Sequence, residues 1–60
     1  MSTKKQQLLT KIIDLELETF RIFKEGKIKA LRYGKGNTAI TFDQSIATSQ
    51  KRIDFFINQL

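Results

Sequence analysis

The feature that most limits what this chain can fold into is its shortness, because 60 residues can form only one small domain. A domain of this size buries only about 60% of the surface that its unfolded chain exposes. Small domains usually make up the shortfall with disulfides, a bound metal or oligomerisation. The sequence has no Cys and no His, so we expect no cofactor and no metal, and we expect residues 1–60 to form a single domain that is homo-oligomeric when assembled.

The first amphipathic segment predicts a helix over about residues 4–25. Thr3 followed by Gln6 has the spacing of a capping box, in which the two side chains satisfy free backbone groups at a helix start. Gly26 is a residue type that commonly ends a helix. At 100° per residue, one side of this helix carries the expected core residues Leu9, Ile12, Ile13, Phe20 and Phe23, flanked by Leu8 and Leu17.

The middle of the chain predicts a two-stranded antiparallel β-hairpin over about residues 28–41. Residues 27–33 alternate in polarity, and glycines in the following stretch 34–37 can supply the positive φ angles of a tight turn. Period-two alternation places Leu31, Tyr33 and Ile40 on the expected inner face.

The last segment predicts a second helix over about residues 42–59. Thr41 and Gln44 repeat the capping-box spacing, and Asp43 adds a carboxylate that suits the first turn of a helix. The apolar arc expected on this helix consists of Phe42, Ile46, Ile53, Phe56, Ile57 and Leu60. Ser49 is the only polar residue within that arc, and its small side chain would let another element approach closely.

From these three segments we expect an α+β fold with the order helix, hairpin, helix, in which the two helices pack antiparallel.

This order of elements resembles the bacteriophage lambda W protein family of head-to-tail joining proteins. The residues that carry the resemblance are Gly26-Lys27, Gly34-Lys35-Gly36 and the spacing of Ile53, Phe56, Ile57 and Leu60. It implies a structural head-completion subunit, not an enzyme, that forms a ring at the portal, helps retain packaged DNA and allows tail attachment. The implied partners are portal and tail-attachment proteins, and the implied location is the virion head-tail junction, after assembly from the host cytoplasm.

Four apolar residues lie outside the expected core and are candidate protein-interface residues. Three of them are seven residues apart in the first helix and so form a second row along it. The alternative is that single exposed apolar residues are ordinary features of protein surfaces. The four residues are Leu8, Leu15, Ile22 and Phe55.

Glu16 falls inside the apolar arc of the first helix, where an unpaired carboxylate would be costly. We expect a partner for it, either a cation or hydroxyl group of the same chain or a residue of a neighbouring subunit.

The expected hairpin is strongly basic, and the chain as a whole carries a formal charge of +5. Lys27, Lys29, Arg32 and Lys35 are candidate contacts with DNA phosphates or with an acidic partner. The alternative is a charged edge that prevents strand-to-strand aggregation. This basic stretch also supports a second function, a small nucleic-acid-binding or regulatory protein of phage or bacterial origin.

The sequence offers little for catalysis. Asp14 and Glu18 are the nearest approach to a catalytic or metal-binding pair, but two carboxylates on a solvated helix are commonplace, and Lys11 and Arg21 are close enough to offset them. No apolar run approaches the roughly 20 residues of a membrane span, so we expect no membrane partner.

Overall fold

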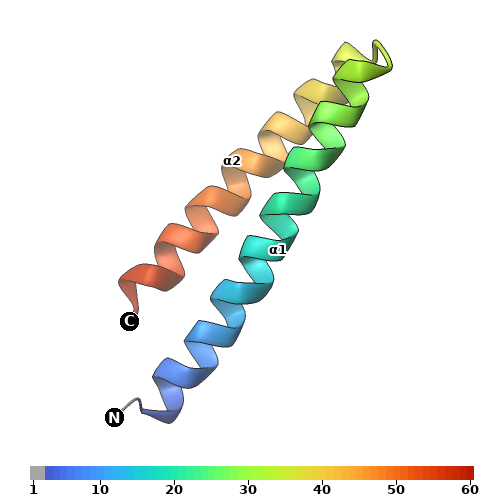
Figure 1. Ribbon diagram of the computed structural model, residues 1–60. Helices are drawn as coiled ribbons and strands as arrows, with labels where there is room; N and C mark the ends of the chain where they lie inside the picture. The colour runs from blue at the N-terminus through green and yellow to red at the C-terminus, as the bar shows by residue number, and fades with distance from the viewer. Residues whose placement is uncertain (1–2) are drawn as a thin grey trace.

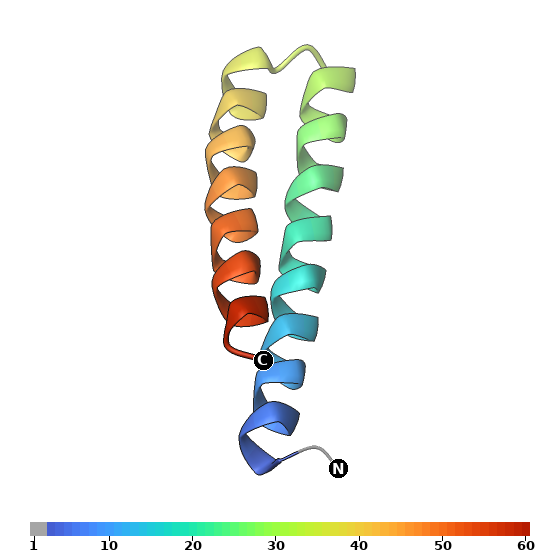
Figure 2. The ribbon, with the colours of Figure 1, turned by 90° about the vertical axis from the view of Figure 1, so that its left-hand side faces the viewer.

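The computed structural model describes residues 3–60, which form two long antiparallel helices. Helix α1 spans Lys4–Arg32 and helix α2 spans Gly36–Asn58, joined by residues 33–35. Figures 1 and 2 show the helices side by side along their length, with α1 extending beyond the end of α2 at the N-terminus. The molecule measures 49 × 14 × 9 Å between Cα atoms and is therefore a rod.

Helix α1 begins where the capping box predicts. The Thr3 hydroxyl accepts a hydrogen bond of 3.1 Å from the Gln6 backbone N–H, and the Gln6 side-chain oxygen accepts one of 3.1 Å from the Thr3 N–H. The two reciprocal bonds satisfy donors that a helix start otherwise leaves free. The predicted capping box is therefore confirmed.

The predicted β-hairpin is wrong, and with it the α+β class. Residues 28–41 contain the end of α1, the link and the beginning of α2, and no strand occurs among residues 3–60. The period-two alternation was misleading because Ala30 and Ala39, 7% and 3% exposed, continue the helical contact between α1 and α2 towards the loop. Leu31, Tyr33 and Ile40 point outwards, not inwards, and each is more than half exposed.

Gly26 does not end the first helix but allows the two helices to approach closely. A Cβ atom added at Gly26 would lie 2.6 Å from Cζ of Phe42 on α2, inside van der Waals contact. The helix ends instead at Gly34, which has a φ of 72°. The Gly34 N–H donates to the Leu31 carbonyl at 3.1 Å and the Lys35 N–H donates to the Ala30 carbonyl at 2.8 Å, the pair of bonds that defines a Schellman motif.

Helix α2 begins at Gly36 and not near Phe42, so the second predicted capping box is also wrong. Thr41 already lies in the second turn, and its hydroxyl donates to the Asn37 carbonyl at 3.2 Å. The early start follows from the short link, because the chain reverses within three residues and α2 then packs on α1 from its first turn through Ala39.

The contact between the helices is a single seam, the row of buried and half-buried residues spaced alternately three and four apart. Such spacing is typical of helices that pack with a slight left-handed supercoil. The seam includes most of the predicted core, but Ile12, Ile57 and Leu60 lie outside it and are exposed. Its members are Leu9, Ile13, Glu16, Phe20, Phe23 and Ala30 on α1 and Ala39, Phe42, Ile46, Ser49, Ile53 and Phe56 on α2.

The close approach at Gly26 predicts a selective cost for filling that position. We expect Gly26→Val to lower the free energy of unfolding by about 1–3 kcal/mol, because the added side chain overlaps the Phe42 ring. Gly36→Val is the matched control, since nothing lies within 4 Å of a Cβ there. Urea denaturation followed by far-UV circular dichroism measures both, and equal stabilities of the two variants would contradict the proposed contact.

Candidate functional site

The seam contains one charged side chain, Glu16, and the structure supplies its partner. Glu16 is 8% exposed, and its Oε1 lies 2.5 Å from Nη2 of Arg52, whose side chain reaches across from α2. The expected cation of the same chain is thus confirmed. Because the guanidinium neutralises the carboxylate, neither group adds an uncompensated charge to the surface beside the seam.

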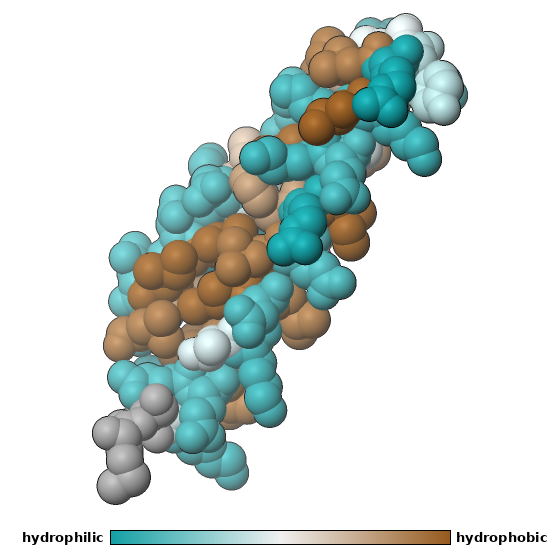
Figure 3. All heavy atoms as spheres, viewed as in Figure 1, coloured by the Kyte–Doolittle hydropathy of each residue, from teal (hydrophilic) through white to brown (hydrophobic). Residues whose placement is uncertain are grey.

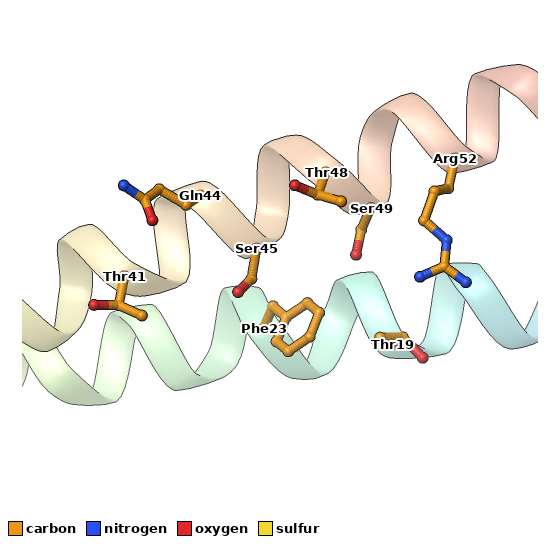
Figure 4. A pocket seen from close by; sticks show the side chains of 8 residues that line it. All are labelled: Thr19, Phe23, Thr41, Gln44, Ser45, Thr48, Ser49 and Arg52. Carbon is orange, nitrogen blue, oxygen red and sulfur yellow. The ribbon is translucent and has the colours of Figure 1, made fainter.

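A groove of about 320 Å³ runs along one side of the seam next to this ion pair. Figure 4 shows the Phe23 ring from α1 beneath Ser45 and Ser49, with Arg52 pointing towards α1. Most of the groove is lined by small hydroxyl side chains, which leave the surface hollowed. The lining residues are Thr19, Phe23, Thr41, Gln44, Ser45, Thr48, Ser49 and Arg52.

The structure places all four candidate interface residues on the same side as this groove. Leu15 and Ile22 lie one turn before and one turn after Thr19, and Phe55 lies two turns after Thr48. Their exposed fractions are 53% for Leu8, 64% for Leu15, 58% for Ile22 and 59% for Phe55. Whether they contact another molecule stays a prediction, but they and the groove form one continuous surface.

We call the part of this surface between Leu8 and Ile22 on α1 and between Thr41 and Phe55 on α2 the uncharged face, because Arg52, already paired with Glu16, is the only charged residue among its ten members. The row of Leu8, Leu15 and Ile22 continues beyond it at Lys29. Charged residues are depleted in the cores of protein interfaces, whereas apolar side chains are retained. This face shares its low charge with interface cores, while four of its ten residues are Ser or Thr. It consists of Leu8, Ile12, Leu15, Thr19 and Ile22 on α1 and of Thr41, Ser45, Thr48, Arg52 and Phe55 on α2.

The opposite side of the hairpin, the mixed face, has a different character. Figure 3 looks onto this side and shows one apolar area over the lower half of the rod and another near the loop, with hydrophilic atoms between and around them. Lys27 and Asp43 form an ion pair across it at 2.6 Å. Exposed apolar residues such as Ile40, 59% exposed, are separated by charges there. The mixed face consists of Asp14, Leu17, Arg21, Lys24, Ile28 and Leu31 on α1 and of Ile40, Asp43, Asp54 and Ile57 on α2.

The four predicted DNA or acidic-partner contacts lie near the loop end of the rod but are not equivalent. Lys27 is engaged with Asp43. Among residues 3–60 the ion pairs involve only Lys27 and Arg52 as cations, so Lys29, Arg32 and Lys35 carry unpaired charge. We call these three residues, with the 69% exposed Tyr33 between them, the basic tip. The alternative role as a protective strand edge is wrong, because this part of the chain is not a strand.

The other sequence features add no further site. Asp14 and Glu18 are exposed on α1, and no group of three possible metal ligands occurs within the described part of the chain. Neither α1 nor α2 has an apolar stretch long enough to cross a bilayer.

The chain was compared with protein-family models, with curated proteins and with solved structures. None of them matches it. The resemblance to the lambda W protein family therefore stays a prediction from the sequence. The helix, hairpin, helix order on which the resemblance partly rested is not the order of residues 3–60, and Gly26-Lys27 does not end a helix.

The hydroxyl side chains of the groove were not predicted as site residues from the sequence, and the two seam alanines, Ala30 and Ala39, were not predicted as core residues. The signal for Ala39 was the alternation of three- and four-residue steps from Ala39 to Phe56, and the signal for Ala30 was its position seven residues, two turns, after Phe23. The signal for the groove was the absence of any charge at Thr41, Ser45 and Thr48 in an otherwise charged sequence.

The ion pair inside the seam predicts a test of its own. We expect Arg52→Met to destabilise the protein by about 1–3 kcal/mol, because it leaves the Glu16 carboxylate buried without a partner. Adding Glu16→Leu should restore most of that loss, since an apolar pair of similar size replaces a buried ion pair at little cost. Thermal denaturation of the two variants measures this, and a fully stable Arg52→Met single variant would contradict the pairing.

Proposed function

We propose that this chain is a non-enzymatic assembly protein that works by packing its uncharged face against another protein. The observation that carries the proposal is that more large apolar residues are exposed than apolar residues are buried. Within residues 3–60, four apolar residues are buried, whereas twelve large ones are exposed. A contiguous exposed apolar patch with a polar surround is the usual mark of a protein-protein interaction site.

The two-helix architecture explains why so much apolar surface remains. One seam covers one stripe of each helix, while the row of Leu8, Leu15 and Ile22 lies beside that stripe and has nothing to pack on. Helical hairpins with a second apolar row commonly complete their core by joining further helices in a bundle. The exposed row is therefore the part of the core that a partner would supply.

The chemistry of the groove also favours a binding role over a catalytic one. Serine and threonine hydroxyls become nucleophiles when an adjacent base removes their proton. The sequence contains no His, and Glu16, the carboxylate nearest the groove-lining Arg52, is held by that guanidinium. The hydroxyls serve better as small, closely packed contact residues.

Among assembly roles, the sequence resemblance suggests a subunit of a phage head-to-tail joint. In that role the uncharged face would contact neighbouring subunits or the portal, and the basic tip would face packaged DNA or an acidic protein surface. The support for this specific role is the resemblance alone, while the surface composition supports the wider class.

The assembly role predicts that charge on the uncharged face blocks complex formation. In cells or phage lysates that produce the protein, we expect Leu15→Glu and Phe55→Glu to move the tagged chain from a large complex to its free form on native gels. Co-purification with a portal ring, lost in the same variants, would support the head-to-tail role. Ile40→Glu on the mixed face is the matched control, since its exposure is the same as that of Phe55. Intact complexes in all three variants would contradict the proposal.

A second candidate function, nucleic-acid binding, is favoured by the basic tip. Three unpaired cations surround the exposed Tyr33 ring, so the tip offers phosphate contacts and one stacking surface.

Binding to a nonspecific DNA duplex tests this second function. Fluorescence anisotropy at increasing salt should show affinity that falls with salt, and replacing Lys29, Arg32 and Lys35 by Gln should reduce the slope of log affinity against log salt by about 2–3. Replacing Lys4, Lys11 and Lys51, which lie away from the tip, is the control. Absence of binding at low salt would exclude the function.

A further inference from the structure

We infer that the partner of the uncharged face is a second copy of this chain, packed antiparallel to the first to form a four-helix bundle. This inference rests on the proposed assembly function, because it names the occupant of the face that carries that function. Four observations support it: the surface area, the hydrogen bonding of the groove hydroxyls, the shape of the face and the distribution of charge.

The surface area of the hairpin is too large for a monomer of its mass. It exposes 4920 Å² for a mass of 7.0 kDa, whereas a compact monomer of that mass exposes about 4,000 Å². The excess of roughly 900 Å² is close to the ~800 Å² that each partner buries in a standard protein interface. The radius of gyration agrees, because 14.3 Å exceeds the roughly 10 Å of a compact chain of this length. One copy of the same size therefore accounts for the excess.

The polar residues of the uncharged face are prepared for burial. The Thr19 hydroxyl donates to the Leu15 carbonyl at 3.1 Å, and the Thr41 hydroxyl donates to the Asn37 carbonyl at 3.2 Å. Arg52 is paired with Glu16. Covering a donor that already has its hydrogen bond avoids the cost of burying an unsatisfied polar group. The Thr19 and Thr41 hydroxyls can thus lose contact with water without leaving an unsatisfied donor, whereas Arg52, whose side chain is 61% exposed, would still have to be dehydrated.

The shape of the uncharged face is complementary to itself when two copies run in opposite directions. The Glu16–Arg52 pair fixes the register of the helices, so Leu15 and Phe55 lie at nearly the same level and form a protrusion. The groove lies about two turns, roughly 10 Å, nearer the loop. Consider a two-fold axis that lies in the plane of the interface and runs across both helices at the level of Thr19. This axis sets each protrusion opposite the groove of the other copy.

That axis also gives the contacts expected in the dimer. Leu15 would pack on the partner's Ile22, and Phe55 would enter the groove between the partner's Thr41 and Ser45. Thr19 lies near the middle of α1, so the same axis superposes the two rods along nearly their whole length. Contacts of this kind, in which each residue pair occurs twice, are those of a closed two-fold dimer.

The positions of the basic tips favour the antiparallel arrangement over the parallel one, in which three cations meet three; in the antiparallel dimer each tip lies near the level of the partner's Lys4 and Lys5. In a parallel dimer the basic tips of both copies would lie together, and the like charges would repel each other. In an antiparallel dimer they lie at opposite ends of a rod 49 Å long. At that distance the charges are separated by several times the screening length of physiological salt, about 8 Å.

Sedimentation equilibrium of the purified chain tests the dimer. We expect a species of twice the 7.0 kDa chain mass, and we expect Phe55→Glu to raise the dimer dissociation constant at least about 30-fold, as loss of a central anchor residue does. Ile40→Glu, on the mixed face, should leave the constant within about threefold. A monomer that is fully helical at every concentration, or equal weakening by both variants, would overturn the inference.

Cysteine cross-linking tests the direction of packing without disturbing the apolar residues. The chain has no Cys, so a single introduced thiol reports one position. Under mild oxidation we expect Thr19→Cys to form a disulfide-linked dimer and Lys35→Cys to remain monomeric. Cross-linking at Lys35→Cys but not at Thr19→Cys would show a parallel dimer and overturn the antiparallel arrangement.

The two proposals fail in different experiments. If the purified chain is a helical monomer, the second copy is wrong, and the native-gel assay in the source cells still decides whether the uncharged face binds a different protein. If that assay shows intact complexes in the Leu15→Glu and Phe55→Glu variants, the assembly function of the face is wrong as well.

Discussion

The seam between α1 and α2 is the interaction on which every other feature of this protein depends. The chain has no Cys to form a disulfide, and the apolar contacts of the seam bring the two helices together. Small residues at Gly26, Ala30 and Ala39 let the backbones approach near the loop, and Phe42 fills the space that Gly26 leaves. The Glu16–Arg52 pair then sets the register in the middle of the rod.

Once the seam has fixed that register, the properties of the two outer faces follow. Residues three and four positions away from the seam on each helix are brought onto common surfaces. One of these collects apolar and hydroxyl side chains with a single neutralised charge, and the other mixes apolar and charged groups. A seam with four buried apolar residues is thin for a folded domain of 60 residues. Two helices alone cannot cover their own apolar surface, and this is the physical reason for the proposed assembly.

The sequence predicted the outer end of each helix and the apolar stripes better than it predicted the middle of the chain, where both inner helix ends were wrong. The Thr3 capping box, the contribution of Ser49 to the helix contact and the need of Glu16 for a partner all follow from local rules, and the structure confirms them. The β-hairpin was wrong because the alternation of Lys27-Ile28-Lys29-Ala30 is equally compatible with one further turn of a helix. Tertiary packing decided between strand and helix, since a buried Ala30 extends the seam.

The roles of the glycines were also predicted wrongly. Gly26 was expected to end the first helix, but Gly26 permits close approach of α2 and Gly34 follows the helix end. The sequence alone does not distinguish a glycine of one kind from a glycine of the other. The four candidate interface residues could be selected from spacing alone, but only the structure shows that they share a face with the groove.

The central claim is that folding of this chain is completed by association through the uncharged face, and thermal unfolding at different concentrations tests it most directly. Far-UV circular dichroism should show a Tm that rises when the protein concentration rises 100-fold, because mass action adds about 2.7 kcal/mol to an associated folded state. For a domain of this size that corresponds to a shift of roughly 10 °C or more. A Tm that is the same at both concentrations, with full helicity at the lower one, would contradict the account.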